Sequence, residues 1–379
     1  MCPAKMKVIK VLLFVLLIPF ISFGQSFFSS PSSYEVAVHE MQITDSSRNE
    51  KLSPDETDFR QVKFRIWYPV KASSKNTKAE YFPELDKIEA ALKAKGDTAS
   101  PILKDLKHAR EINIKAYKNG ELIKSIKTPL IVFSSGGNVS ENSYSAFAQE
   151  FSGKGCVVVV ISHPYSSLGY FDKLGFLMSS PYWKGLNDTS AVISDAFDNE
   201  LSDLLAEDAN LVVENFKNSQ NSILKKLRPI IDFNKVVIAG HSRGGKTVAR
   251  ACNDYPVFKA GIVFDNLAPA RERLTGIDQP LLFIRTQWAA ERTANLESYL
   301  NKNKSFALDA VFEKANHFSF TDFGVFHFPG YEAKLDPNEC FKQSNMLVDL
   351  FLDVVFNKKD ISSLRNKTFS DAQIKLYGL

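Results

Sequence analysis

The segment Lys235-Val-Val-Ile-Ala-Gly-His-Ser-Arg-Gly-Gly245 is a run of β-forming residues that ends in Gly-x-Ser-x-Gly, and helix-compatible residues follow it. This order is typical of a nucleophile elbow, a sharp turn from a buried strand into a helix with the serine at its tip. Gly240 and Gly244 leave room for the turn, because a Cβ there would collide with the neighbouring strand or helix. Ser242 is then predicted to stand at a helix N-terminus, whose dipole favours negative charge. An ordinary glycine-rich turn is the alternative.

Strand and helix patterns alternate along the rest of the chain, which favours an α/β fold with a mostly parallel, doubly wound sheet. Continuous apolar runs at residues 129–133 and 156–161 are typical of strands that are covered on both faces. Residues 61–69 alternate apolar and polar side chains, as an early strand near the sheet edge would. The other strands are expected at residues 261–264, 280–284 and 306–312, and helices at 142–152, 201–216, 246–252 and 346–356.

Two stretches interrupt this alternation. Residues 73–127 are polar and rich in lysine, and we interpret them as a solvated insertion with one short helix at 85–95. Residues 166–200 leave the carboxyl edge of the sheet, where doubly wound folds bind ligands, and are predicted to form a cap. A surface segment packed by its own aromatic residues is the alternative. The residues expected to line an apolar pocket under this cap are Tyr170, Phe171, Phe176 and Trp183.

The first 25 residues have the pattern of a secretory signal peptide. Three lysines precede an apolar run at residues 11–23, and Gly24-Gln25-Ser26 follows it as a cleavage region. The run is short for a membrane span of about 20 residues and Pro19 interrupts it, so membrane anchoring is the less favoured alternative. We expect residues 26–379 to form a single domain that is secreted or periplasmic.

The net charge and the cysteines of the chain exclude some kinds of partner and site. Removal of the three lysines with the signal segment takes the formal charge from +4 to about +1, so the mature chain is nearly neutral. No basic stripe indicates a nucleic acid partner, and no block of like charge indicates an acidic one. The cysteines that remain after removal of the signal segment, Cys156, Cys252 and Cys340, do not have the spacing of a zinc site. Their odd number argues against a disulfide scaffold, although one bridge stays open.

A serine hydroxyl needs a general base that a third group orients. After an elbow of this kind the chain order is Ser, then Asp or Glu, then His. Only His317 and His327 follow Ser242. His317 comes directly after the last expected parallel strand and is the preferred base, whereas His327 lies in an aromatic segment further on. His241, beside the nucleophile, is expected to point elsewhere, because neighbouring side chains on a turn diverge. It is expected to be a packing residue or one that supports the catalytic residues from behind.

Two residues could supply the acid. Asp265 directly follows the strand at 261–264, whereas Glu291 lies some six residues into a helical segment beyond the next strand. Asp265 is preferred because a strand tip places it rigidly.

An oxyanion hole needs backbone N–H groups aimed at the developing charge. Arg243, directly after the nucleophile, should supply one. The loop Ser134-Ser-Gly-Gly137 should supply the other, with Gly137 preferred to Gly136, unless the glycines only form a flexible turn.

Four blocks within about residues 60–355 carry a specific resemblance. They are Arg65-Ile-Trp-Tyr-Pro69, Pro129-Leu-Ile-Val-Phe-Ser134 with Tyr144-Ser-Ala146, Gly240-His-Ser-Arg-Gly-Gly245 and His317-Phe-Ser-Phe-Thr-Asp-Phe323. With these blocks the chain resembles the plasma-type platelet-activating factor acetylhydrolase family of α/β-hydrolases. The resemblance implies an α/β-hydrolase fold, a triad of Ser242, Asp265 and His317, and oxyanion amides from Gly137 and Arg243.

The chain departs from the family pattern beside the expected pocket. Ser135-Gly136 stands where the family usually has His-Gly, and Asn266-Leu-Ala268 replaces bulky apolar residues of the vertebrate enzyme. The elbow also resembles, over a short stretch, chlorophyllases and dienelactone-hydrolase-like esterases.

These features predict a secreted serine carboxylic-ester hydrolase that forms an acyl-enzyme and needs neither metal nor cofactor. The resemblance implies phospholipids with short or oxidised acyl chains as substrates, with transient contact to a lipid surface. A general short-chain esterase, a chlorophyllase-like esterase and an extracellular polyesterase are alternatives. A peptidase or a non-catalytic binding protein of the same fold is a more distant one. The sequence leaves the oligomeric state open.

Overall fold

The structure is a computed structural model and describes residues 33–73, 76–178, 195–365 and 368–378. The expected signal segment and Trp183 lie outside these ranges. None of the helices in the described ranges is both long and apolar enough to cross a bilayer.

The strands of the described chain form one nine-stranded sheet in the order β1-β2-β4-β3-β7-β8-β9-β10-β11, with a separate hairpin of β5 and β6. Its six inner strands from β4 to β10 are parallel, and the strands beyond them on either side are antiparallel. The strands are β1 Glu35–Asn49, β2 Phe59–Val70, β3 Thr128–Ser134, β4 Val157–Ser162, β5 Gly169–Phe171, β6 Gly175–Leu177, β7 Ile231–His241, β8 Phe258–Phe264, β9 Leu281–Thr286, β10 Ala307–Phe312 and β11 Gln373–Tyr377.

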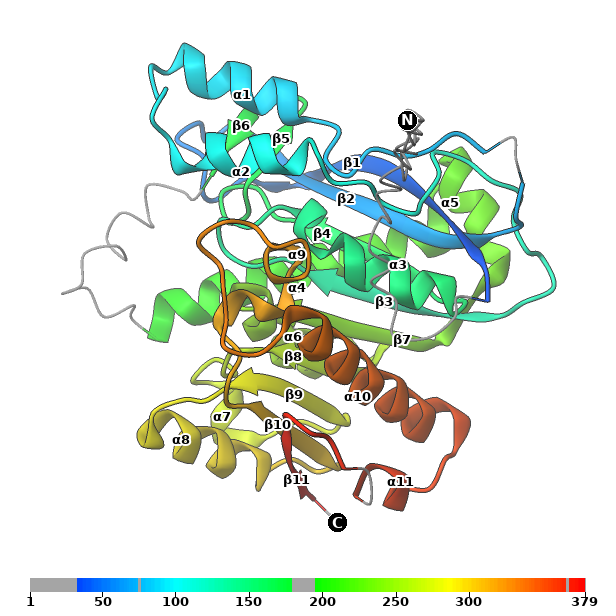
Figure 1. Ribbon diagram of the computed structural model, residues 1–379, viewed down its shortest axis with the longest axis vertical. Coiled ribbons are helices and arrows are strands. Elements are labelled where there is room, and N and C mark those ends of the chain that lie inside the picture. The colour runs from blue at the N-terminus through cyan, green and yellow to red at the C-terminus, as the bar shows by residue number, and fades with distance from the viewer. Residues whose placement is uncertain (1–32, 74–75, 179–194, 366–367, 379) are drawn as a thin grey trace, which may run out of the picture.

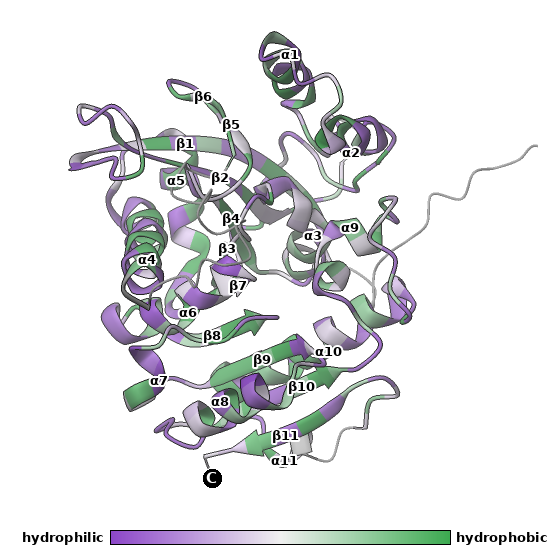
Figure 2. Cartoon of the chain, turned by 90° about the vertical axis from the view of Figure 1, so that its left-hand side faces the viewer, coloured by the Kyte–Doolittle hydropathy of each residue, from purple (hydrophilic) through white to green (hydrophobic). Residues whose placement is uncertain are grey.

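Helices cover both faces of the sheet. Figure 2 shows α4 and α6 on one side of it and α3 and α10 on the other. Successive residues of β4 enter opposite layers: Val158 and Val160 pack with α3, whereas Val157 and Val159 pack with α4. This double burial explains why the central strands are continuous apolar runs. The longer helices are α1 Leu85–Ala94, α2 Pro101–Ala109, α3 Ser145–Gly153, α4 Asp195–Asn218, α6 Arg243–Asp254, α8 Ala290–Leu300 and α10 Pro337–Asn357.

The sequence patterns missed the two outermost strands. Strand β1 pairs with the whole length of β2, so β2 is not at the edge of the sheet as expected. Strand β11 pairs with β10 and follows the last long helix, α10, beyond which the sequence patterns indicated no further element. Both strands are largely polar and partly exposed. An edge strand can carry polar side chains because it is not covered on both faces.

Residues 73–127 contain the expected helix at 85–95 as α1, but they also contain a second helix, α2, and are less solvated than expected. They form two helices, α1 and α2, which bury Ile88, Leu92 and Leu106 in the same core layer as the central strands. Figure 1 shows both helices at one end of the molecule, beside the β5–β6 hairpin. The lysines of both helices lie on their outer, exposed faces. Because lysines are so frequent in this segment, the few apolar residues that form the buried stripe of each helix did not stand out in the sequence.

Candidate active site

Ser242 stands at the junction of β7 and α6, with φ 53° and ψ −120°. A positive φ is costly for serine, and such strain is typical of a nucleophile that is held exposed at a tight turn. A Cβ on Gly240 would collide with the carbonyl group of Gly244, and one on Gly244 with the carbonyl of Ser134. These backbone approaches explain the two glycines of the motif. Ser242 is the N-cap residue of α6, so the positive end of the helix dipole lies at the nucleophile.

Asp265 and His317 meet next to this turn. Asp265 follows β8 directly, and its Oδ2 lies 2.6 Å from Nδ1 of His317. His317 follows β10, and its side chain is 40% exposed. The bond gives Nδ1 the proton and leaves Nε2 as the basic atom, which is the tautomer that a general base requires. The structure therefore joins the two residues that the sequence preferred as acid and base.

The other oxygen of Asp265 is fully occupied. Its Oδ1 accepts hydrogen bonds from the backbone N–H of Thr286 at 2.9 Å, the hydroxyl of Thr286 at 2.8 Å and the indole N–H of Trp288 at 2.8 Å. Burial by itself would raise the pKa of Asp265, but the hydrogen bonds from His317 and Thr286 outweigh it and hold the pKa well below its usual range. The carboxylate is thus kept ionised beside the imidazole.

The alternative residues lie elsewhere. Glu291 is exposed in the first turn of α8, on the solvent side of the helix. His327 is exposed in the loop that follows the short helix Asp322–Val325.

The loop after β3 is held against the elbow from several sides. Its Ser135 hydroxyl donates to the carbonyl of Ile161 at 2.7 Å, and the N–H of Asn138 donates to the carbonyl of Ser166 at 2.8 Å. A Cβ built on Gly136 would lie 3.4 Å from Cβ of Ser242. Gly136 therefore lies beside the nucleophile, and Gly137, the expected oxyanion donor, is the next residue of this loop. Arg243 opens α6, so its N–H lies at the helix N-terminus.

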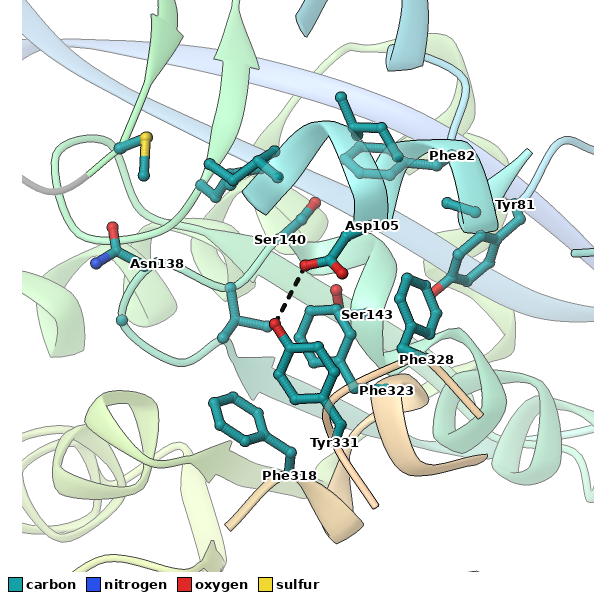
Figure 3. Close-up of a pocket in the computed structure, with 17 residues that line it drawn as sticks. Tyr81, Phe82, Asp105, Asn138, Ser140, Ser143, Phe318, Phe323, Phe328 and Tyr331 are labelled. Atoms are coloured by element: carbon teal, nitrogen blue, oxygen red, sulfur yellow. Dashed lines mark hydrogen bonds between the residues drawn. The ribbon is translucent and has the colours of Figure 1, made fainter. Parts of the chain in front are cut away.

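A cavity of about 240 Å³ adjoins this loop. Figure 3 shows it between α2 and the segment that follows His317. Its walls are mostly apolar and aromatic, and Asp105 is the one charged residue among those that line it. The hydroxyl of Tyr331 donates to Oδ2 of Asp105 at 3.1 Å across the cavity. The lining comprises Tyr81, Phe82, Ile102, Asp105, Leu106, Ala109, Gly137, Asn138, Val139, Ser140, Ser143, Leu168, Met178, Phe318, Phe323, Phe328 and Tyr331.

Three aromatic residues of the expected cap fall within the described ranges, Tyr170, Phe171 and Phe176, and none of the three lines this cavity. Tyr170 and Phe171 are in β5 and Phe176 is in β6, and the hairpin packs on α1. Nζ of Lys87 lies 5.1 Å from the ring centre of Tyr170, and Phe176 is buried. The pocket is closed instead by α2 and by the neighbours of the hairpin, Leu168 and Met178.

Some residues that support the site were missed by the sequence reasoning. Trp288 donates a hydrogen bond to Asp265. The guanidinium groups of Arg285 and Arg292 lie 4.8 and 3.9 Å from the centre of its ring. Asn266 donates to the carbonyl of Ser242 at 2.7 Å and so ties the strand tip to the elbow. No spacing rule connects these positions in the sequence. A buried tryptophan shortly after the next strand was the one usable signal, because its N–H needs an acceptor.

The described ranges contain no group of three or more His, Cys, Asp or Glu residues that could hold a metal ion. The three cysteines Cys156, Cys252 and Cys340 are buried and not bonded to one another. Burial raises the pKa of each thiol, so none of them is prepared to act as a thiolate.

Comparison with known proteins agrees with this architecture. The chain matches the solved structure of a ferulic acid esterase from Streptomyces cinnamoneus with a TM-score of 0.74 over 93% of this chain and 99% of that one, at 16% identity. Such a similarity establishes the fold, which is the α/β-hydrolase fold expected from the sequence.

Two curated relatives of the chain are platelet-activating factor acetylhydrolases. The platelet-activating factor acetylhydrolase of Cavia porcellus is 29% identical over 56% of this chain and 52% of its own length. That of Gallus gallus is 25% identical over 78% of this chain and 74% of its own. The chain thus spans about half the length of the first of these relatives. The family model described as "Platelet-activating factor acetylhydrolase, isoform II" matches residues 46–174 and 199–369, so the chain belongs to this family of α/β-hydrolases.

Proposed function

We propose that this protein is a serine carboxylic-ester hydrolase that works through an acyl-enzyme. The observation that carries the proposal is the hydrogen bond between Asp265 and His317 beside a serine held at positive φ on an elbow. Family membership and the esterase fold of a structural relative support the same class of reaction.

The geometry supports the following acylation step. Oγ of Ser242 attacks the ester carbonyl carbon while Nε2 of His317 accepts the hydroxyl proton. Asp265 keeps the proton of Nδ1 in place and stabilises the imidazolium that forms. The carbonyl oxygen becomes an oxyanion, which the N–H groups of Gly137 and Arg243 stabilise.

Collapse of this intermediate releases the alcohol. His317 protonates the departing alkoxide and is then neutral again, with Ser242 acylated. A water molecule next loses its proton to His317 and attacks the acyl carbon. The acid leaves, and the proton returns from His317 to Ser242. Each proton that moves is thus carried by a single imidazole.

The substrate that we propose is a phospholipid with a short or oxidised acyl chain, taken up by transient contact with a lipid surface. The names of the relatives support this choice. The apolar cavity supports it in size, since about 240 Å³ exceeds the roughly 150 Å³ that holds a benzene ring. A general short-chain esterase would use the same pocket.

A single purified preparation can test this function. Hydrolysis of 4-nitrophenyl esters of increasing acyl length should be compared with release of acetate from a 2-acetyl phosphatidylcholine. Ser242→Ala should lower turnover by about 10³-fold or more and abolish labelling by a fluorophosphonate. Labelling that persists in this variant would show that another residue is the nucleophile. Activity on the nitrophenyl esters alone would favour the general esterase.

We also propose that the protein is exported. The charged, apolar and cleavage regions of the first 25 residues support this. N-terminal sequencing of the protein from cells and from the medium or periplasm should find a start near Ser26 in the exported fraction. An intact N-terminus in all fractions would contradict it.

A further inference from the structure

His241 is the residue directly before the nucleophile, and it is fully buried. The sequence left its role open between packing and support of the expected catalytic residues, and its contacts favour support. Nδ1 lies 3.0 Å from the hydroxyl oxygen of Tyr144, and Nε2 lies 2.8 Å from the backbone carbonyl oxygen of His317. One imidazole thus connects α3 with the segment that carries the base.

The directions of these hydrogen bonds follow from the atoms that take part. The carbonyl of His317 can only accept, so Nε2 of His241 carries the proton and donates it. The backbone N–H of Gly136 donates to the Tyr144 oxygen at 2.9 Å. The tyrosine proton is then free to go to Nδ1 of His241, which has the lone pair. A chain of three hydrogen bonds therefore runs from Gly136 through Tyr144 and His241 to His317, and we call it the relay. Each polar atom named here has a hydrogen-bond partner.

The two ends of this relay lie at the expected oxyanion loop and at the expected base. Gly136 immediately precedes Gly137, the expected oxyanion donor. His317 is the base, and its ring centre lies 4.5 Å from that of His241. Burial lowers the pKa of His241 to about 3, so the ring beside the imidazolium stays neutral and does not repel it.

We propose that His241 and Tyr144 are positioning residues that set the oxyanion loop and the general base relative to each other. The inference rests on the proposed function, because it assigns roles to Gly137 and His317. It concerns the geometry of the transition state, in which donors and base must be aligned at the same moment.

The fold does not depend on this relay alone. The carboxylate of Asp322 accepts the N–H groups of Ser145 at 2.9 Å and Ala146 at 3.0 Å. This link joins the segment after His317 to the start of α3 independently of His241. Loss of the relay should therefore misalign the site while the segment stays attached.

Two amide variants separate the two halves of the relay. In His241→Asn the amide can occupy the place of Nδ1 and keep the bond to Tyr144, but it cannot reach His317. In His241→Gln the amide can occupy the place of Nε2 and keep the bond to His317. His241→Phe keeps a ring and removes both bonds, and Tyr144→Phe removes the hydroxyl alone. Tyr299→Phe is the matched control, because it removes a buried hydroxyl that has no hydrogen-bond partner among the described residues and lies in the other core layer.

The measurement is kcat and KM for a 4-nitrophenyl ester, expressed per active site titrated with a fluorophosphonate. We expect kcat to fall about 10-fold in His241→Phe and in Tyr144→Phe, with KM nearly unchanged, since a buried donor is left unpaired. The double variant should lose little more than the worse single one. Each amide variant should recover part of the loss, and the control should match the wild type.

Three results would overturn the inference: wild-type kcat per titrated site in His241→Phe, fully additive losses in the double variant, or equal losses in the control. These results can be distinguished from a failure of the proposed function, which the nucleophile test measures. If the wild type hydrolyses no ester, or Ser242→Ala is still labelled, the proposed function fails. If both of those tests succeed and the relay variants behave as wild type, only the positioning role fails.

Discussion

Four hydrogen bonds fix the carboxylate of Asp265, one from His317 and three from Thr286 and Trp288. Asp265 itself has φ 51°, a conformation that is costly for a residue with a side chain. The partners on β9 and beyond hold it in this strained position. At the scale of the single residue, therefore, the acid is selected by its surroundings as well as by its order in the chain.

Substitution of the two candidate acids, Asp265 and Glu291, should have very different effects on turnover. Asp265→Asn should reduce turnover by about 10⁴-fold, because an amide cannot favour the required imidazole tautomer. Glu291→Gln should have little effect, because Glu291 is exposed on α8. Steady-state kinetics on one ester suffice for the comparison. A large loss in Glu291→Gln with a small one in Asp265→Asn would move the acid to the next strand.

Asp265 should also contribute to acid sensitivity. Its pKa in the folded protein lies below the ordinary value of about 3.9, so its contribution to stability is fully present above that value. It is lost as the pH falls through the lower, folded-state pKa. The contribution is on the order of 2 kcal/mol for such a carboxylate. Urea unfolding between pH 5 and 3 should give a shallower pH dependence in Asp265→Asn than in the wild type, and equal slopes would refute this.

At the scale of the element, helix α2 decides how the pocket is closed. It places Ile102, Asp105 and Leu106 in the lining, and Asp105 bonds to Tyr331 on the opposite wall. Burial raises the pKa of Asp105. His108 of the same helix contacts the carbonyl oxygen of Phe326 through Nε2, at 2.8 Å. Helix α2 is thus fastened at two points to the segment that follows the base.

Ile102→Trp should fill part of the cavity without touching the expected triad. We expect KM to rise for esters with a bulky acyl or alcohol group, while kcat for 4-nitrophenyl acetate stays within about 2-fold of the wild type. Lys104→Trp is the control, because Lys104 is exposed on the same helix and does not line the cavity. Equal effects on short and bulky esters would show that the cavity does not receive the substrate.

At the scale of the whole molecule, a buried ion network ties distant parts together. Arg60 in β2 binds Glu50 at 2.7 Å and Asp208 of α4 at 2.6 Å, and all three side chains are inaccessible to solvent. Asp208 also accepts from Nδ1 of His163 at 2.8 Å, and Nε2 of that ring lies 2.8 Å from the hydroxyl of Ser134. The network thus reaches the loop of the expected oxyanion hole.

Removal of Arg60 should be far more damaging than removal of an exposed cation. Arg60→Ala leaves the buried Glu50 without its cation and removes one of the two arginines from Asp208, which keeps Arg48 at 3.1 Å. It should lower the free energy of unfolding by about 3–5 kcal/mol. Lys71→Ala breaks a pair whose side chains are 57% and 70% exposed and should change it by about 0–1 kcal/mol. Chemical denaturation compares the two. A loss below about 1 kcal/mol in Arg60→Ala would mean that the network relaxes or admits water.

The sequence by itself determined the features that depend on local chemistry and chain order. The elbow followed from the glycines, because their neighbours leave no room for a Cβ. The parallel strands followed from apolar runs that must be covered on both faces. The pairing of Asp265 with His317 followed because consecutive strands of a parallel sheet end at one edge.

Only the tertiary structure decided the features that depend on partners far apart in the chain. Trp288 as a ligand of Asp265, the relay from Gly136 to His317 and the burial of α2 all join residues on different elements. A polar or lysine-rich segment has no local signal that shows which of its few apolar residues will find a core. The edge strands β1 and β11 are also held by backbone pairing with a neighbouring strand. The pattern of polar and apolar side chains predicts such pairing only weakly.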